Sequence, residues 1–168
     1  MTPRTSRLLD SVGRYEGDLF ADLLAFERAG DRVVLATDSF TAFVPFAARW
    51  PVELHLLPNR HVPDLAALTD GEKDELAEVY LRLLRAVDAL YATPTPYIAA
   101  WHQAPVRTHR EQVRLNLQLT SPRRSADRFK YLAGSEAAMG AWIGDLVPEQ
   151  TADRFRAALA KADAERPL

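Results

Sequence analysis

Residues 40–72, FTAFVPFAARWPVELHLLPNRHVPDLAALTDGE, form the stretch that decides the fold. It holds two runs of strand-forming residues, at 40–44 and 52–57, which are bracketed by Pro45, Pro51 and Pro58. Proline is tolerated at strand ends, because the N–H that it lacks is not needed there for the ladder of hydrogen bonds. The stretch therefore predicts two short strands, with a loop leading out of the second one.

The end of this stretch opens the clearest helix of the chain, residues 69–92. Thr69 and Glu72 have the spacing of a capping box, in which each side chain accepts a hydrogen bond from a backbone N–H at the helix start. Apolar residues then recur every three or four positions, which gives the helix one apolar stripe. The stripe consists of Leu76, Val79, Tyr80, Leu83, Val87, Leu90 and Tyr91.

The flanking sequence adds further elements on both sides. A short helix is expected at 19–26, ending at Gly30 and burying Leu19, Leu23 and Phe26 on one face. Strands are expected at 32–37, 97–101 and 113–120, and a surface helix at 148–164. Consecutive hairpins with a helix on one face predict an α+β fold with an antiparallel sheet of about five strands. Residues 17–168 are expected to form this one domain, after a polar tail at 1–16.

Composition excludes several functional classes. The chain has 168 residues, 21 basic against 23 acidic side chains, and no cysteine. The absence of cysteine excludes disulfides, thiolate catalysis and cysteine-based zinc sites. The net charge of −2 argues against general nucleic-acid binding, and no apolar stretch approaches the roughly 20 residues of a membrane span. We expect a cytoplasmic protein that binds neither nucleic acid nor membrane.

Positive charge gathers in one segment, residues 107–130, which carries seven basic and two acidic side chains. Within it, the strand at 113–120 alternates, so that Arg114, Asn116 and Gln118 share a polar face. An anion or nucleotide site at this face is one interpretation, and a solvated loop with exposed arginines is the other.

The four histidines give no motif on their own. His55 is interpreted as a sheet-surface imidazole, His61 lies in a loop, and His102 follows a strand, where functional side chains are common. No two histidines have the close spacing of a helix or strand metal motif, and no Walker, dinucleotide-binding or nucleophile-elbow pattern occurs. The residues alone therefore predict an α+β domain with a polar strand face beside a basic loop, and no specific chemistry.

The stretch at 40–72 resembles the C-terminal half of the galactose-1-phosphate uridylyltransferase family, within the histidine-triad superfamily. Supporting segments follow in order: residues 101–105 (WHQAP), the strand at 115–119, and residues 130–136 (KYLAGSE). The resemblance covers roughly residues 17–160. It implies a histidine-triad-like sheet and UMP transfer between UDP-glucose and a hexose 1-phosphate, in a dimeric enzyme of galactose metabolism.

The resemblance also implies roles for single residues. Five positions match the loop that contacts the hexose phosphate: Lys130, Tyr131, Ala133, Ser135 and Glu136. Lys130 would meet a phosphate or a sugar hydroxyl, and Glu136 would hydrogen-bond the sugar. Ser135 stands where the family often has tyrosine, and Trp142 where a glutamine assists sugar binding.

Other family features are missing. The chain has no His-Pro-His segment, which carries the nucleophile in the first half of the family's enzymes. His102 matches a metal-binding histidine, but Asn116 and Gln118 stand where further histidines often lie. Amides are weaker ligands than imidazole for a transition metal. The zinc or iron site of the family is therefore expected to be lost, and these three residues to be its remnant.

The sequence leaves four hypotheses about the function of the chain open. The chain supplies the C-terminal half of a uridylyltransferase, inactive alone and paired with a first-half chain or as a homodimer. Alternatively, it is a non-catalytic module that binds nucleotide sugars or sugar phosphates. A third reading makes His102 or His109 an independent nucleophile. In the fourth, Trp50, Trp101 and Trp142 build a dimer surface in a protein with a structural role.

Overall fold

The computed structural model describes residues 11, 13–144 and 146–165 of the chain. Most of the predicted polar tail, residues 1–10 and 12, lies outside this part. The described strands are β1 (Val33–Ala36), β2 (Phe40–Phe43), β3 (Val52–Pro58), β4 (Ile98–His102) and β5 (Asn116–Ser121). The helices are α2 (Leu19–Arg28), the short 3-10 helix η1 (Leu65–Ala67), α3 (Asp70–Ala89), α4 (Gly134–Met139) and α5 (Pro148–Glu165).

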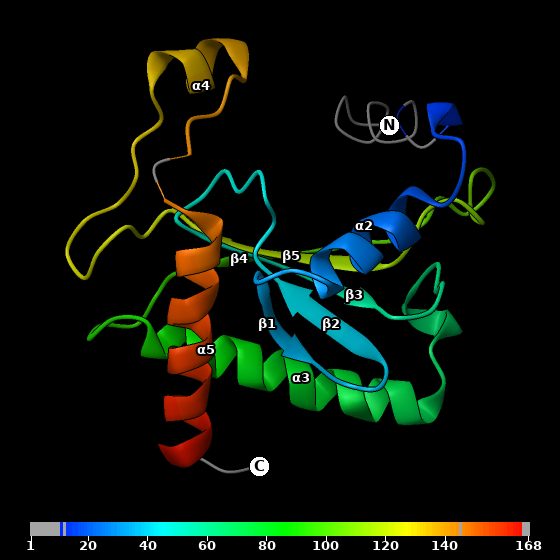
Figure 1. Cartoon of the computed structure of the whole chain (residues 1–168), viewed down its shortest axis with the longest axis horizontal. Helices are drawn as coiled ribbons and strands as arrows, with labels where there is room; N and C mark the ends of the chain where they lie inside the picture. The colour runs from blue at the N-terminus through cyan, green and yellow to red at the C-terminus, as the bar shows by residue number, and fades with distance from the viewer. Residues whose placement is uncertain (1–10, 12, 145, 166–168) are drawn as a thin grey trace.

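The five strands form one antiparallel sheet in the order β1-β2-β3-β5-β4 (Figure 1). The predicted α+β class and the antiparallel sheet are confirmed. β5 begins at Asn116, three residues later than the alternation suggested, because Val113 and Leu115 bond to the loops before it: the N–H of Leu115 donates to the carbonyl of Val62.

One face of the sheet carries the main core, under α3 and α5. Alternate residues of β3 and β5, including Leu54, Leu56, Leu117 and Leu119, pack there against Phe155 of α5 and the apolar stripe of α3. The capping box of α3 is present as predicted, with Thr69 and Glu72 each accepting a backbone hydrogen bond. Because these residues face α3 and α5, the residues that alternate with them point to the opposite face of the sheet.

α2 covers part of that opposite face, but with a different side from the one predicted. Its buried residues are Phe20, Leu24 and Glu27. Phe20 and Leu24 pack on Phe43 and Leu57 of the sheet. The predicted stripe is wrong for two of its three members, because Leu23 and Phe26 are 38% and 64% exposed. Apolar residues line both sides of this helix, so periodicity alone could not choose the buried side.

A buried arginine joins α2, β1 and α5. Arg32, just before β1, donates to Glu27 Oε2 of α2 at 2.9 Å and to Glu149 Oε1 of α5 at 2.7 Å. Its guanidinium also lies 5.4 Å and 5.5 Å from the ring centroids of Phe26 and Phe46. Only 9% of its side chain and 1% of that of Glu27 is exposed, so the two charges depend on each other.

The outer edge of β1 is covered by α5. Arg156 donates from Nη1 to the backbone carbonyls of Asp31, at 3.0 Å, and Val33, at 2.5 Å. These carbonyls point away from β2, because the intervening Arg32 carbonyl accepts from the N–H of Val44 inside the sheet. The side chain of Arg156 thus donates to two carbonyls that would otherwise accept hydrogen bonds from a further strand.

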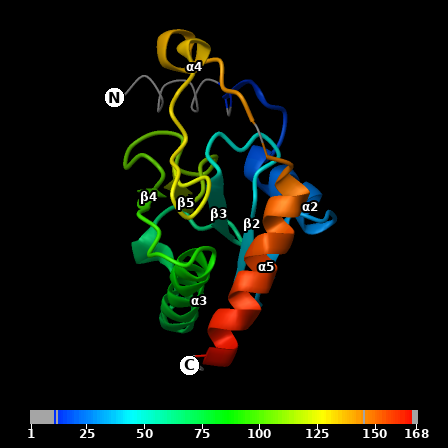
Figure 2. The same ribbon diagram turned by 90° about the vertical axis from the view of Figure 1, so that its left-hand side faces the viewer.

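The segment that carries α4 lies apart from the sheet. Both views place α4 at one end of the molecule and the last turn of α5 at the other (Figures 1 and 2). α4 ends at Gly140, which adopts φ +66°, and the N–H groups of Gly140 and Ala141 donate to Glu136 and Ser135. This is a glycine-terminated helix end, which reverses the chain toward α5.

Candidate functional site

The three predicted remnants of a metal site lie together on the sheet. His102 of β4 is the direct cross-strand partner of Asn116 in β5, and Gln118 lies two residues further along the same face. Gln118 is in turn the direct partner of His55 in β3. The face opposite the main core therefore carries a continuous row of polar side chains over three neighbouring strands.

Within this row the amide of Asn116 donates a hydrogen bond to the protein backbone. Asn116 is buried, and its Nδ2 donates to the carbonyl of Arg114 at 3.0 Å. Among the described residues no group of three histidine, cysteine, aspartate or glutamate side chains could hold a metal ion. The residues present therefore do not fit the transition metal that the resemblance implies.

A carboxylate, Glu53, fixes His55, one of the two histidines of the row. Glu53 Oε1 lies 3.2 Å from His55 Nε2, while its Oε2 accepts from the backbone N–H of Arg49 at 2.7 Å and of Trp50 at 3.1 Å. Burial alone would raise the pKa of Glu53, but the hydrogen bonds from His55 and from this backbone lower it below its ordinary value. The pair sets the orientation of the imidazole, in keeping with the predicted sheet-surface histidine.

The predicted substrate loop is organised around a buried ion pair. Lys130 Nζ lies 2.7 Å from Glu136 Oε1, with 7% and 1% of the two side chains exposed. Lys130 also donates to the carbonyls of Arg49 and Ile143, both at 2.8 Å. All three N–H groups of this ammonium are therefore used inside the protein.

Glu136 is satisfied in the same way. Its Oε2 accepts from the N–H of Ala133 at 2.8 Å, and its Oε1 accepts from the N–H of Ile143 at 3.1 Å. The hydrogen bond from Lys130, followed by those from Ala133 and Ile143, lowers the pKa of Glu136 to about 2. These bonds tie both ends of the 130–143 segment together and give the loop one shape.

The low pKa of Glu136 predicts a pH-dependent contribution to stability. Its carboxyl has an ordinary pKa of 4.5 and a folded value of about 2, so its contribution is complete above pH 4.5 and is lost as the pH falls toward 2. The melting temperature of the protein should exceed that of Glu136→Gln at pH 6, and the gap should narrow toward pH 2. Melting curves of both proteins from pH 6 to pH 2 measure this.

Other acidic groups titrate in both proteins and cancel in that difference. A gap that stays constant over the range would show that Glu136 acts through packing and neutral hydrogen bonds, without its charge.

Of the other predicted loop residues, Tyr131 is the one that faces solvent most fully, at 89% exposed. Ala133 and Ser135 are half-buried, Ala133 as the residue before α4 and Ser135 within its first turn. The structure thus groups the five predicted residues on one loop, with Lys130 and Glu136 turned inward and Tyr131 turned outward.

Trp142 lies beside the same ion pair. Its ring centroid is 5.3 Å from that of Trp50, at an angle of 62°. Arg49 and Lys130 place their cationic groups 5.8 Å and 5.7 Å from it. This arrangement was not predictable from the sequence, because the contacting residues are distant along the chain and follow no common period. Trp101, by contrast, packs edge-on against Tyr80 of α3.

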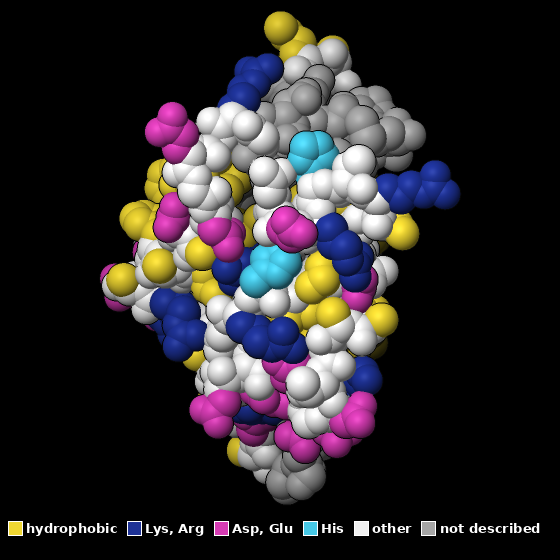
Figure 3. Space-filling view, turned by 90° about the vertical axis from the view of Figure 1, so that its right-hand side faces the viewer, with side chains coloured by type: hydrophobic (Ala, Val, Ile, Leu, Met, Phe, Trp, Pro, Cys, Tyr) yellow, Lys and Arg dark blue, Asp and Glu magenta, His cyan; other side chains and the backbone are white. Residues whose placement is uncertain are grey.

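The basic segment 107–130 does not form a single charged surface. Several of its cations have internal partners: Arg110 pairs with Asp64, Arg114 with Asp18 and Lys130 with Glu136, while Arg123 stacks on Tyr91 and Phe129. One face of the molecule shows positive and negative side chains interspersed (Figure 3). His109 is exposed on this segment, at φ +56°, with its Nδ1 2.7 Å from Gln112 Oε1.

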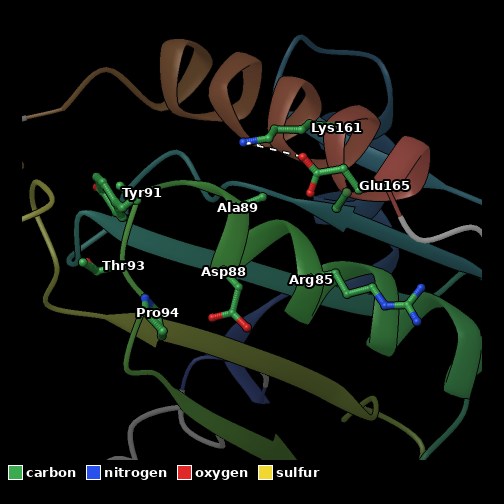
Figure 4. A pocket seen from close by; sticks show the side chains of 10 residues that line it. Arg85, Asp88, Ala89, Tyr91, Thr93, Pro94, Lys161 and Glu165 are labelled. Atoms are coloured by element: carbon green, nitrogen blue, oxygen red, sulfur yellow. Dashed lines mark ion pairs between the residues drawn. The ribbon is translucent and has the colours of Figure 1, made fainter.

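A pocket of about 410 Å³ lies elsewhere, between the ends of α3 and α5 (Figure 4). It is lined by charges of both signs, including Arg85, Asp88, Lys161 and Glu165, and the last two form an ion pair at 3.9 Å. None of the predicted site residues lines it.

Within the part of the chain that the structure describes, every helix is too short or too polar to span a bilayer.

Comparison with known proteins identifies the family of the chain. Residues 11–166 match the family model described as galactose-1-phosphate uridyl transferase, C-terminal domain. A galactose-1-phosphate uridylyltransferase of Streptomyces lividans is 38% identical over 92% of this chain and 48% of its own length. That of Rattus norvegicus is 38% identical over 75% of this chain and 34% of its own length. The chain spans at most about half the length of these curated relatives.

Solved structures extend the comparison to three dimensions. A uridylyltransferase structure superposes with a TM-score of 0.86 at 33% identity, over 96% of this chain and 52% of that one. A zinc-bound histidine triad protein from Mycobacterium smegmatis shares the fold, with a TM-score of 0.58 at 17% identity, over 89% of this chain and 100% of its own. The predicted histidine-triad-like architecture is confirmed. With the family model covering nearly all of its described residues, the chain belongs to the galactose-1-phosphate uridyl transferase C-terminal domain family.

Proposed function

We propose that this chain acts as the C-terminal half of a hexose-1-phosphate uridylyltransferase, together with a separate N-terminal half. The reaction would transfer UMP between UDP-glucose and a hexose 1-phosphate in the cytoplasm. The observation that supports it best is the 130–136 loop, which is built and held in one shape by the buried pair of Lys130 and Glu136. A buried ion pair adds little net stability but can hold a segment in one conformation, which a loop that binds a ligand requires.

The arrangement of that loop suggests a division of labour. Lys130 and Glu136 form their hydrogen bonds with other groups of the protein, so we assign them as positioning residues. Tyr131 and Ser135 are then the side chains available to the sugar phosphate, and the backbone around Ala133 presents them. A fixed loop favours binding, since less conformational entropy is lost when the ligand arrives.

The nucleophile has to come from elsewhere under this proposal. Covalent transfer of UMP requires a histidine aimed at the phosphorus and held by a second group. The chain contains no His-Pro-His segment, and His102 and His109 lie on different elements, the end of β4 and an exposed loop. A first-half chain would supply the reacting histidine, and this chain the contacts to the sugar.

A UMP-exchange assay with UDP-glucose and galactose 1-phosphate tests the proposal. The chain alone should give no turnover, and turnover should appear when the N-terminal half of the Streptomyces lividans enzyme is added, because nucleophile and sugar loop are then together. Tyr131→Ala in the mixture should reduce kcat/KM about 10-fold or more, as expected for one lost contact. Val106→Ala, an equally exposed loop change outside the site, is the control.

Turnover by the chain alone would contradict the proposal and place the nucleophile on one of its own histidines. No complex and no gain in activity on mixing would also contradict it.

A second candidate function is a binding module without catalysis. The burial of Asn116 against the carbonyl of Arg114 favours it, because the Nδ2 of that amide is used by the protein backbone. Calorimetric titration of the chain with UDP-glucose and galactose 1-phosphate decides this candidate. It requires saturable binding by the isolated chain, and no heat up to millimolar ligand would exclude it.

A further inference from the structure

Glu53, near the start of β3, binds the loop that precedes its own strand. Its Oε2 accepts from the backbone N–H of Arg49 at 2.7 Å and from that of Trp50 at 3.1 Å, and only 7% of its side chain is exposed. Although burial raises the pKa of Glu53, hydrogen bonds from His55 and from the N–H of Arg49 keep it below its ordinary value. The carboxylate is therefore charged near neutral pH, and a charged acceptor makes stronger hydrogen bonds than a neutral one.

The same two residues hold the 130–136 loop on their other side. The carbonyl of Arg49, whose N–H donates to the carboxylate, accepts from Lys130 Nζ at 2.8 Å. The ring of Trp50 packs edge-on against that of Trp142, with 5.3 Å between the two centroids. These two contacts attach the loop segment to the sheet at the point that the carboxylate fixes.

Contacts inside the loop segment extend this attachment. Lys130 pairs with Glu136 at 2.7 Å. Glu136 in turn accepts from the N–H of Ala133 at 2.8 Å and from that of Ile143 at 3.1 Å. Tyr131, which is 89% exposed, directly follows Lys130 in the chain. A shift of the carbonyl that anchors Lys130 would therefore displace Tyr131 as well.

Glu53 is anchored to the sheet by its other oxygen. Its Oε1 lies 3.2 Å from His55 Nε2, and its backbone pairs with Thr120 of β5 in the register of the sheet. Burying a carboxylate is unfavourable, and the contacts that it gains often do little more than offset this loss of solvation. A fully satisfied buried polar group does, however, impose one geometry on the groups around it. Here that geometry joins the sheet to the loop before β3.

We propose that Glu53 is a positioning residue for the 130–136 loop, acting through Arg49 and Trp50. This inference rests on the proposed function, since the position of the loop matters for the sugar phosphate that it would contact. A misplacement of about 1 Å far from the reacting atoms can lower a rate by about 100-fold. The carboxylate itself does not touch the substrate under this proposal.

Hydrogen exchange of the purified chain, followed by NMR for each amide, measures how firmly the loop is held. Glu53→Ala should speed exchange of the Ala133 and Ile143 N–H groups at least about 10-fold relative to the amides of β5, because the loop loses its anchor. Glu53→Gln should leave these rates nearly unchanged. Its amide oxygen can accept from both backbone N–H groups, while its nitrogen donates to His55.

The matched control is Glu75→Ala. Glu75 is also a carboxylate that accepts from a backbone N–H, that of Ser39 at 3.0 Å, but it joins α3 to the turn between β1 and β2. Its loss should not speed exchange in the loop selectively. Lys130→Met tests the same link from the other end and keeps Glu53, and the two N–H groups that Glu53 binds should then exchange faster.

The two-chain UMP-exchange assay gives a second readout. With the N-terminal half of the Streptomyces lividans enzyme, Glu53→Ala should raise KM for galactose 1-phosphate about 10-fold, and Glu53→Gln less than about 3-fold. Glu75→Ala should leave this KM unchanged. A merely structural role of Glu53 would reduce the amount of folded chain, and hence the apparent kcat, without changing KM.

The exchange rates decide the inference without any turnover. Faster exchange at Ala133 and Ile143 in Glu53→Ala, absent in Glu53→Gln and in Glu75→Ala, supports it. A uniform increase over the chain, no increase, or the same increase in Glu53→Gln overturns it, because the loop would then not depend on these hydrogen bonds. If Glu53→Ala does not fold, Lys130→Met decides in its place, and unchanged exchange there overturns the inference.

The assay separates this inference from the proposed function. If the mixture that contains the unaltered chain gives no turnover, the proposed function is overturned, and the exchange rates still decide whether Glu53 positions the loop. If that mixture turns over and Glu53→Ala leaves KM unchanged, the positioning role is overturned and the proposed function stands.

Discussion

Replacing Arg32 with leucine is expected to lower the free energy of unfolding by about 3–5 kcal/mol, the usual effect of breaking a buried ion pair from one side. Glu27, with 1% of its side chain exposed, would lose its guanidinium partner and stay buried without a compensating hydrogen bond from it. The link between α2, β1 and α5 would be lost at the same time. Urea unfolding followed by circular dichroism measures the difference.

The double variant Glu27→Leu with Arg32→Leu serves as the control. Removing both charges also removes the unpaired carboxylate, and such replacements are often close to neutral. We therefore expect the double variant to recover most of the stability. If it were as unstable as Arg32→Leu, the loss would come from packing or from Glu149, and not from a stranded charge.

Phe155→Ala is expected to cost about 3–5 kcal/mol, as large-to-small changes of buried aromatic residues do. Phe155 is fully buried, and it lies in the cluster that joins α5 to the sheet and to α3. Its loss leaves a cavity where two helices and the sheet meet, so the packing of α5 should loosen. Hydrogen exchange should rise along α5 before it rises in β3 and β5.

Lys161→Ala on the same helix is the comparison, since that side chain is 62% exposed, and it should change stability by less than about 0.5 kcal/mol. A loss by Phe155→Ala of the same small size would mean that α5 contributes little to the core.

The sheet was predictable because its signals are local. Prolines bracket β3, alternation marks β5, and the capping box of Thr69 and Glu72 fixes the start of α3. The buried side of α2 was not predictable, because both Leu23 and Leu24 offer an apolar choice and the decision is made by Phe43 and Leu57 on a sheet that forms elsewhere.

The candidate site was also predictable only where family resemblance or local sequence marks it. Family resemblance located the loop, and the alternation of β5 placed Asn116 and Gln118 on one face. The inward pairing of Lys130 with Glu136 could not be read from the sequence, because the five residues between them follow no regular period and the deciding acceptors are backbone carbonyls. The Trp50–Trp142 contact escaped prediction for the same reason.

The position of Arg156 has a consequence for how this sheet can grow. Its guanidinium occupies the carbonyls of Asp31 and Val33 along the outer side of β1. The strand order within the described residues leaves β4 as the other edge. A sheet with both edges open can be extended from copy to copy without end, whereas a sheet with one blocked edge can accept only one neighbour. A strand added at β1 would first have to displace Arg156 from these two carbonyls, so strand addition is favoured at β4 over β1.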